Sequence, residues 1–253
     1  MLRTRVIPIL LLCDSSLVKT IKFNDFTYIG DPANTVRIFN ELEVDELIFL
    51  DIKASKENKK PNLKVLREIA DECFMPLAYG GGICSLDDAK EVFEIGFEKV
   101  SLNSHAINNP SLITDLANHY GSQSVVVSID VKSNIFGQST VRSMSGKFNT
   151  KNDPIKWAIE VERLGAGEIL LTSIDREGTW KGYDLDLVRE ITKAVSIPVI
   201  ANGGCGTIKD LGDVIKKSNA SAAALGSMVV FQKKGMGVLI NFPSLNKLED
   251  VLL

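Results

Sequence analysis

One aspartate is the clearest candidate for acid–base chemistry in this sequence. Asp130 ends the apolar run 124–130, and a carboxylate in such a place can exchange a proton with a reacting group. The similar run 5–11, near the start of the chain, ends in Leu11 instead. Leucine cannot exchange protons, so half of a possible acid–base pair is missing.

Glycine-containing segments follow other apolar runs and occur in matched pairs. Glycine lets backbone N–H groups approach an anion, and a helix that starts there adds a favourable dipole. Tight turns that need a positive φ are the alternative. The duplication favours two phosphate sites that face each other and suit a ligand with a phosphate at each end. The residues assigned to them are Gly81, Gly82, Asn103, Ser104, Gly178, Gly203, Gly204, Gly226 and Ser227. Further residues expected at the same end are Lys19, Asp51, Thr172 and Ser173.

Strand-like runs alternate with amphipathic segments and must position these side chains. Asp31 and Pro32 are typical of an N-cap and a first helical residue. The continuous apolar runs predict parallel strands covered by helices, which favours a (β/α)8 TIM barrel over a doubly wound sheet. The predicted strands are 5–11, 46–51, 75–80, 98–103, 124–130, 168–173, 197–202 and 221–226.

An internal repeat supports the barrel. The segment 46–52 resembles 168–174, and Pro76 and Pro198 keep the same offset of 122 residues. We therefore predict one domain, 1–253, made by a half-barrel duplication with halves of about 1–122 and 123–253. The site should lie at the C-terminal ends of the strands.

Composition limits the function classes. The chain has 253 residues and a net charge of −3 without a dense basic run, which argues against nucleic acid as a partner. No apolar run reaches the roughly 18 residues of a membrane span. The four cysteines form no C-x-x-C pair, which fits a reducing compartment, and we expect a cytoplasmic protein. Neither a metal nor another cofactor is expected.

Several motifs together resemble the cyclase subunit of imidazole glycerol phosphate synthase over nearly the full length. They include GDPANTVRIFNE, DELIFLDI, YGGGI, KVSLNS and GAGEILLTSIDREGT. The resemblance implies lyase and cyclase chemistry with two aspartates, at the ends of strands one and five, and ammonia supplied by a glutaminase docked on the opposite face. Asp130 matches the second aspartate. Leu11 stands at the first, Cys13 replaces a usual lysine, and Asp14 would have to reach back along a loop.

Charged residues begin four of the predicted strands: Arg5, Glu46, Lys99 and Glu168. The resemblance implies that they form a salt-bridged gate for ammonia at the N-terminal face, where the glutaminase docks. Charges at a barrel bottom can also serve stability or simply face water, which is the alternative.

Other stretches, among them LLCDSSLVKTIKF and VLINFP, resemble cyclase-like proteins found with surface-polysaccharide genes. This subgroup implies an ammonia-conducting subunit of an amidotransferase system that makes acetamidino groups on N-acetyl sugars. An N-acetyl sugar amidotransferase would be a partner, and a phosphorylated small molecule or nucleotide sugar the ligand. The missing aspartate favours this interpretation over an authentic cyclase or a non-catalytic scaffold. The long segment 132–153 is either a hairpin lid or an inert insertion.

Overall fold

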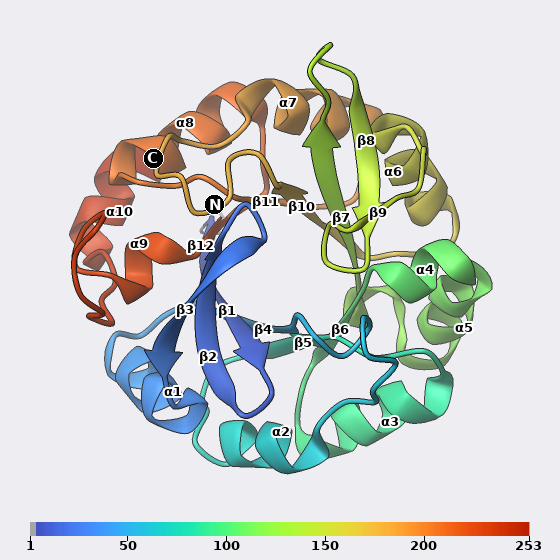
Figure 1. Cartoon of the computed structure of the whole chain (residues 1–253), viewed down its shortest axis with the longest axis horizontal. Coiled ribbons are helices and arrows are strands. Elements are labelled where there is room, and N and C mark those ends of the chain that lie inside the picture. Colours follow the sequence, from blue (N-terminus) through green and yellow to red (C-terminus); the bar gives the residue numbers. More distant parts are fainter. Residues whose placement is uncertain (1–3, 253) are drawn as a thin grey trace.

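The computed structural model describes residues 4–252 and consists of a closed barrel of parallel strands inside a ring of helices (Figure 1). Strand β7 pairs with β10, which closes the barrel and confirms the (β/α)8 fold. Each predicted run forms one strand. The barrel strands are β1 (Arg5–Cys13), β4 (Leu47–Asp51), β5 (Leu77–Gly80), β6 (Lys99–Leu102), β7 (Val125–Ser133), β10 (Glu168–Ser173), β11 (Val199–Asn202) and β12 (Ala222–Leu225).

Helices connect the strands and cover the outside of the barrel (Figure 1). The Asp31 side chain accepts a hydrogen bond from the Asn34 amide and caps the first helix, as expected from the sequence. Along residues 4–252, no helix combines the length and the apolar composition needed to cross a membrane. The helices are α1 (Pro32–Glu41), α2 (Leu63–Ala70), α3 (Leu86–Ile95), α4 (Ser104–Asn108), α5 (Ser111–Tyr120), α6 (Pro154–Arg163), α7 (Leu185–Ala194), α8 (Ile208–Ser218), α9 (Ser227–Val230) and α10 (Leu245–Leu252), with a 3-10 turn η1 (Ser122–Ser124).

Strand side chains alternate between two separate cores. In β1, Val6 and Leu10 pack outward against the helices, whereas Ile7, Ile9 and Leu11 point into the barrel. The interior core is completed by Val18, Ile48, Ala78, Val126, Leu170, Ile200, Ala222 and Ala224. The barrel is therefore filled with apolar side chains at mid-height, as expected for eight strands.

Strand register is the same in the two halves. Leu11 in β1 lies opposite Leu50 in β4, and Asp130 in β7 lies opposite Thr172 in β10. Leu50 and Thr172 are separated by the repeat offset of 122 residues. The register thus agrees with the alignment of Leu11 with Asp130, and the boundaries of the half-barrels stay a prediction.

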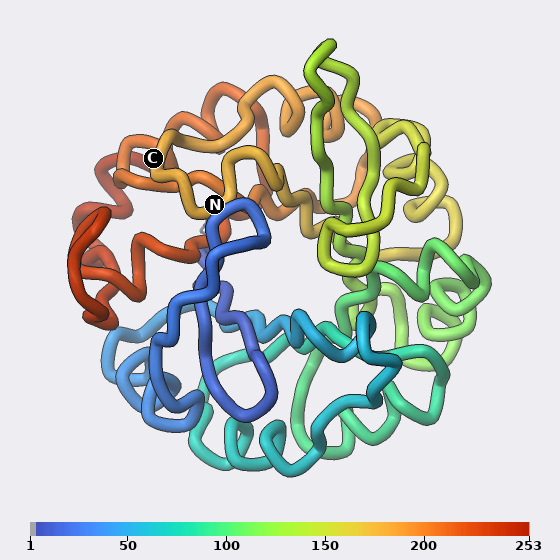
Figure 2. The backbone as a smooth tube through the Cα atoms, in the orientation of Figure 1, coloured from blue at the N-terminus to red at the C-terminus, as the bar shows by residue number. Residues whose placement is uncertain are grey.

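Two ribbons extend beyond the barrel strands at its C-terminal end. The first, β2 (Ser16–Ile21) with β3 (Asn24–Gly30), follows β1 and was not expected from the sequence. The second comprises the end of β7, β8 (Ser139–Ser143) and β9 (Phe148–Asn149), so the segment 132–153 is indeed a hairpin. Figure 2 shows the two ribbons on opposite sides of the barrel opening.

Candidate functional site

A cavity open to solvent occupies the C-terminal end of the barrel, and together with the solvent at its mouth it encloses about 1170 Å³ of empty space. All nine residues assigned to phosphate binding line it, together with Lys19, Asp51, Thr172, Leu11 and Asp130. Ser173 is the exception, because its hydroxyl donates to the Asp184 carboxylate (3.3 Å) and does not line the cavity. The assignment of Ser173 to the mouth was therefore wrong. Strand alternation explains this, because Ser173 follows inward-facing Thr172.

Asp130 lies at the floor of the cavity, with only 8% of its surface exposed. Ser128 Oγ donates to Oδ1 (3.3 Å) and Asn103 Nδ2 donates to Oδ2 (3.2 Å). Burial raises the pKa of Asp130 to about 7, the hydrogen bonds from Thr172 and Ser128 oppose this, and the Glu177 charge adds to it. A carboxyl group with such a pKa can both take up and release a proton near neutral pH.

Leu11 faces Asp130 across the barrel, because β1 and β7 are four strands apart in the closed order. It lines the cavity and is 8% exposed. Asp14 does not replace the missing acid, since its carboxylate pairs with Lys53 (2.7 Å) and does not line the cavity. The first position of the expected aspartate pair is therefore apolar in structure as well as in sequence.

Two further titratable groups line the cavity near Asp130. Glu177 accepts hydrogen bonds from the Thr20 hydroxyl and the Phe23 amide, both at 3.1 Å. Burial raises the pKa of Glu177, against the effect of the Lys19 charge. Lys19 is buried and donates to the Ile9 carbonyl (2.8 Å), and burial lowers its pKa to about 8. Sequence reasoning placed Lys19 here but missed Glu177, which only the motif DREGT could have indicated.

The glycine turns need glycine for steric reasons. Gly82 has a φ of +71°, and a Cβ there would lie 2.3 Å from the Lys59 carbonyl oxygen. Gly204 has a φ of +108°, and a Cβ there would lie 2.2 Å from the Gly182 carbonyl oxygen. The tight-turn explanation thus holds at both places, and it leaves the backbone open to an anion. Phosphate binding stays a prediction.

The hairpin 132–153 packs on the glycine site that follows β5 and β6, which contains Gly81, Gly82, Asn103 and Ser104. The Met144 amide donates to Ser104 Oγ (3.0 Å), and Ser145 Oγ donates to the Ile52 carbonyl (2.8 Å). Ser145 also lines the cavity. The hairpin therefore contributes to the wall of the site and is not an inert insertion, whereas its role as a lid stays a prediction. Among residues 4–252, no group of three His, Cys, Asp or Glu side chains could hold a metal ion.

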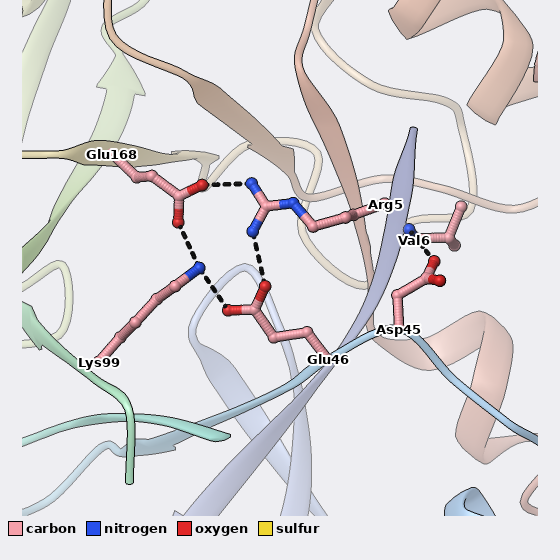
Figure 3. Close-up of polar contacts among 6 residues, drawn as sticks. All are labelled: Arg5, Val6, Asp45, Glu46, Lys99 and Glu168. Carbon is pink, nitrogen blue, oxygen red and sulfur yellow. Dashed lines mark hydrogen bonds and ion pairs between the residues drawn. The ribbon is translucent and has the colours of Figure 1, made fainter. Parts of the chain in front are cut away.

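A closed ring of ion pairs occupies the opposite end of the barrel (Figure 3). Arg5 contacts Glu46 (2.6 Å) and Glu168, and Lys99 contacts Glu46 (3.0 Å) and Glu168 (2.8 Å). Both glutamates are buried, whereas Arg5 keeps 29% and Lys99 16% of the side chain exposed. Each buried carboxylate thus has two cationic partners, which offsets the cost of its desolvation. The structure brings the four predicted gate residues together.

The family model described as "Histidine biosynthesis protein" matches residues 5–234. The chain belongs to this family. A Pseudomonas aeruginosa protein named "Putative imidazole glycerol phosphate synthase subunit hisF2" is 51% identical over 98% of this chain and 99% of its own length. The Clostridium botulinum (strain Okra) "Imidazole glycerol phosphate synthase subunit HisF" is 42% identical over 96% of both chains. A Vibrio vulnificus relative with the corresponding name ending in hisF3 is 45% identical over 96% of this chain.

These findings confirm the resemblance to the cyclase subunit at the level of the family. The matches span almost the whole chain and include both ends of the barrel. The names of the three relatives refer to imidazole glycerol phosphate synthase, and none of the three refers to a sugar or a polysaccharide. The polysaccharide subgroup inferred from the sequence therefore has no support in these relatives.

Proposed function

We propose that this chain is the ammonia-using, cyclase-type subunit of a glutamine-dependent synthase related to imidazole glycerol phosphate synthase. The names of the relatives support this function over sugar amidination, which the missing aspartate favoured. The single observation that supports the proposal is that two features lie at opposite ends of the same barrel. A buried carboxyl group with a pKa of about 7 stands at one end, and a closed ring of ion pairs stands at the other.

The mechanism follows from this arrangement. A glutaminase subunit on the N-terminal face would release ammonia at the ring of Arg5, Glu46, Lys99 and Glu168. Neutral ammonia would pass the apolar interior more readily than ammonium, because burying an unpaired charge is costly. At the cavity, ammonia would attack a carbon atom of a substrate held by its phosphate groups. Asp130 would take the proton that the new C–N bond releases and return it to the leaving oxygen.

A second proton-transfer group is needed because Leu11 cannot act. We assign this role to Glu177, which lines the cavity close enough for its charge to raise the pKa of Asp130. Lys19 lies beside Glu177 and would stabilise its ionised form. The acid–base pair would then be displaced from β1 to the loop after β10.

Ring closure with ammonium salt in place of glutamine tests this function. The purified chain should convert the open-chain intermediate of imidazole glycerol phosphate synthase to imidazole glycerol phosphate. Asp130→Asn and Glu177→Gln should each lower the rate by about 10²–10⁴, the usual contribution of a general acid or base. Glu160→Gln, on the outer surface of α6, is the matched control. No product from the wild type at saturating ammonium would contradict the proposal.

A second candidate is delivery of ammonia for amidination of an N-acetyl sugar, with an N-acetyl sugar amidotransferase as partner. Leu11 favours it, because ammonia delivery does not need the first aspartate. Amidination of a nucleotide-linked N-acetyl sugar from glutamine should then require this barrel in addition to the amidotransferase and the glutaminase. If amidination proceeds equally fast without the barrel, this candidate is wrong. If ring closure is absent as well, only a scaffold role remains.

A further inference from the structure

His105 is a half-buried histidine in the wall of the cavity. It is the second residue of α4 and directly follows Ser104. Strands β5 and β6 are neighbours with Gly80 opposite Ser101, so the turns that follow them lie side by side. The imidazole therefore stands at the glycine site that follows β5 and β6.

The other side chains of this site are engaged within the protein. Asn103 Nδ2 donates to the Ser128 carbonyl (3.0 Å) and to Asp130 Oδ2 (3.2 Å), and the Ser104 hydroxyl donates to Asn103 Oδ1 (3.3 Å). The imidazole of His105 has neither a hydrogen bond nor an ion pair within residues 4–252. Both of its ring nitrogens can therefore bind a ligand.

Burial disfavours the charged form of His105. It lowers the pKa of the imidazole, and the charge of Asp88 only partly opposes this. The Asp88 carboxylate is already engaged, because it pairs with Lys60 (3.0 Å) and accepts from the Ser85 hydroxyl (2.8 Å). An anion bound beside the imidazole would stabilise the charged form and favour protonation.

We propose that protonated His105 binds a phosphate group held at this glycine site, and that the ligand is a phosphate monoester. A monoester has its second pKa at about 6, so it changes charge in the same pH range as a histidine. The imidazolium donates from both nitrogens, and hydrogen bonds between ions are stronger than those between neutral groups. The inference rests on the phosphate-binding cavity of the proposed function, to which it adds a charged binding residue.

Other groups near the site also respond to pH. The titratable side chains that line the same cavity are Lys19, Asp51, Lys56, Asp130 and Glu177. The pKa values of Asp130 and Lys19 are about 7 and about 8, so both change charge near neutral pH. In α5 and in the ribbon of β8 and β9, Asp115, His119 and Lys147 are exposed, and Arg142 stays charged. All of these groups are unchanged in a variant of His105, so the difference from the wild type isolates His105.

Nuclear magnetic resonance of the imidazole rings tests the inference on the unmodified chain. The chain contains two histidines, and exposed His119 in α5 is the internal control. Inorganic sulfate is the probe, because it stays a dianion in the pH range in which phosphate itself titrates. Between about pH 5 and about pH 8, saturating sulfate should raise the pKa of His105 by about 1 and that of His119 by less than about 0.2.

Linkage then determines the pH dependence of binding. A group whose pKa is higher in the bound state strengthens binding below its free pKa, and the gain is lost as the pH rises through the bound pKa. In calorimetric titrations with sulfate, His105→Gln should therefore weaken binding about tenfold at about pH 5 and less than about twofold at about pH 8. His119→Gln is the matched control and should change neither affinity.

Methyl phosphate and dimethyl phosphate test the ligand class. At about pH 7 the monoester should bind at least about tenfold more tightly, since it carries nearly two negative charges and the diester carries one. Equal affinities would overturn the assignment to a monoester.

The outcomes separate this inference from the proposed function. If sulfate does not bind the wild type at either pH, the phosphate-binding cavity is wrong and the inference falls with it. If sulfate binds but the pKa of His105 stays constant, or if His105→Gln binds sulfate as the wild type does, the assignment of His105 is wrong and the cavity stands. An equal rise in the pKa of His119 would show a general effect of ionic strength and would also overturn the assignment. Ring closure with ammonium tests the proposed reaction separately, and its absence would not affect sulfate binding.

Discussion

Leu11 and Asp130 occupy equivalent register positions, but their surroundings differ. Asp130 receives hydrogen bonds from Asn103 and Ser128, whereas Leu11 pairs with apolar Val18 and Leu50. A carboxylate introduced at Leu11 would therefore be largely buried among apolar neighbours. This makes Leu11→Asp a poor test of lost chemistry, because desolvation would oppose the ionised form. The pH dependence of Asp130 itself is more informative.

The raised pKa of Asp130 predicts a pH-dependent penalty on stability. Burying the ionised carboxylate lowers the free energy of unfolding. This loss is absent below the unfolded pKa of about 4, where the group is protonated in both states, and it grows until the pH passes the folded pKa of about 7. Asp130→Asn should therefore be more stable than the wild type at pH 8, by about 2–4 kcal/mol, and similar at pH 4. Urea unfolding at both pH values measures this. The exposed Asp186→Asn variant is the control, and a constant difference between wild type and Asp130→Asn would disprove the assignment.

At the scale of elements, the sequence predicted the barrel strands, whose positions are determined by hydrophobic patterning. Every barrel strand coincides with a continuous apolar run of the sequence, because both faces of the strand are buried. The β2–β3 ribbon escaped prediction because β3 is almost entirely exposed, Phe26 and Tyr28 included, and so has no buried apolar face. Its turn also lacks glycine: the two turn positions with positive φ are occupied by Lys22 (+53°) and Phe23 (+63°). Non-glycine residues seldom do so, which removes the usual hairpin signal.

Glu177 holds this ribbon against the loop that follows β10. The Phe23 amide and the Thr20 hydroxyl donate to its carboxylate, and the Lys22 amide donates to its carbonyl. Glu177→Ala removes the two side-chain bonds, so the Phe23 amide should exchange its hydrogen at least about tenfold faster. Native-state hydrogen exchange measures this, with Glu160→Ala as the control. Unchanged protection of Phe23 would mean that the ribbon is held without Glu177.

At the scale of the molecule, the repeat predicted which residues meet. The repeat placed the glycine pairs at one end of the barrel, and the strand starts placed Arg5, Glu46, Lys99 and Glu168 at the other, because all eight strands run in one direction. Single loop residues were beyond its reach. Glu177 lies in a loop without periodicity, and its importance depends on its burial and on the donors that hold its carboxylate. Those are properties of the folded chain.

The ring of ion pairs at the N-terminal face leads to a prediction about how glutamine hydrolysis at one end of the barrel is coupled to product formation at the other. Lys99→Ala leaves Glu46 and Glu168 with only Arg5, so the ring opens and the barrel loses about 1–3 kcal/mol, since the site is partly solvated.

In complex with its glutaminase, Lys99→Ala should hydrolyse several glutamines for each product formed, whereas the wild type should stay near one. With ammonium salt in place of glutamine, the variant should keep most of its rate, because ammonia can then reach the cavity from its open end. Lys217→Ala, which breaks a surface pair with Asp213 on α8, is the control for the loss of a lysine. Two results would count against a gate. One is an unchanged glutamine-to-product ratio. The other is an equal loss of activity with glutamine and with ammonium, which would show that the ring serves only the stability of the barrel.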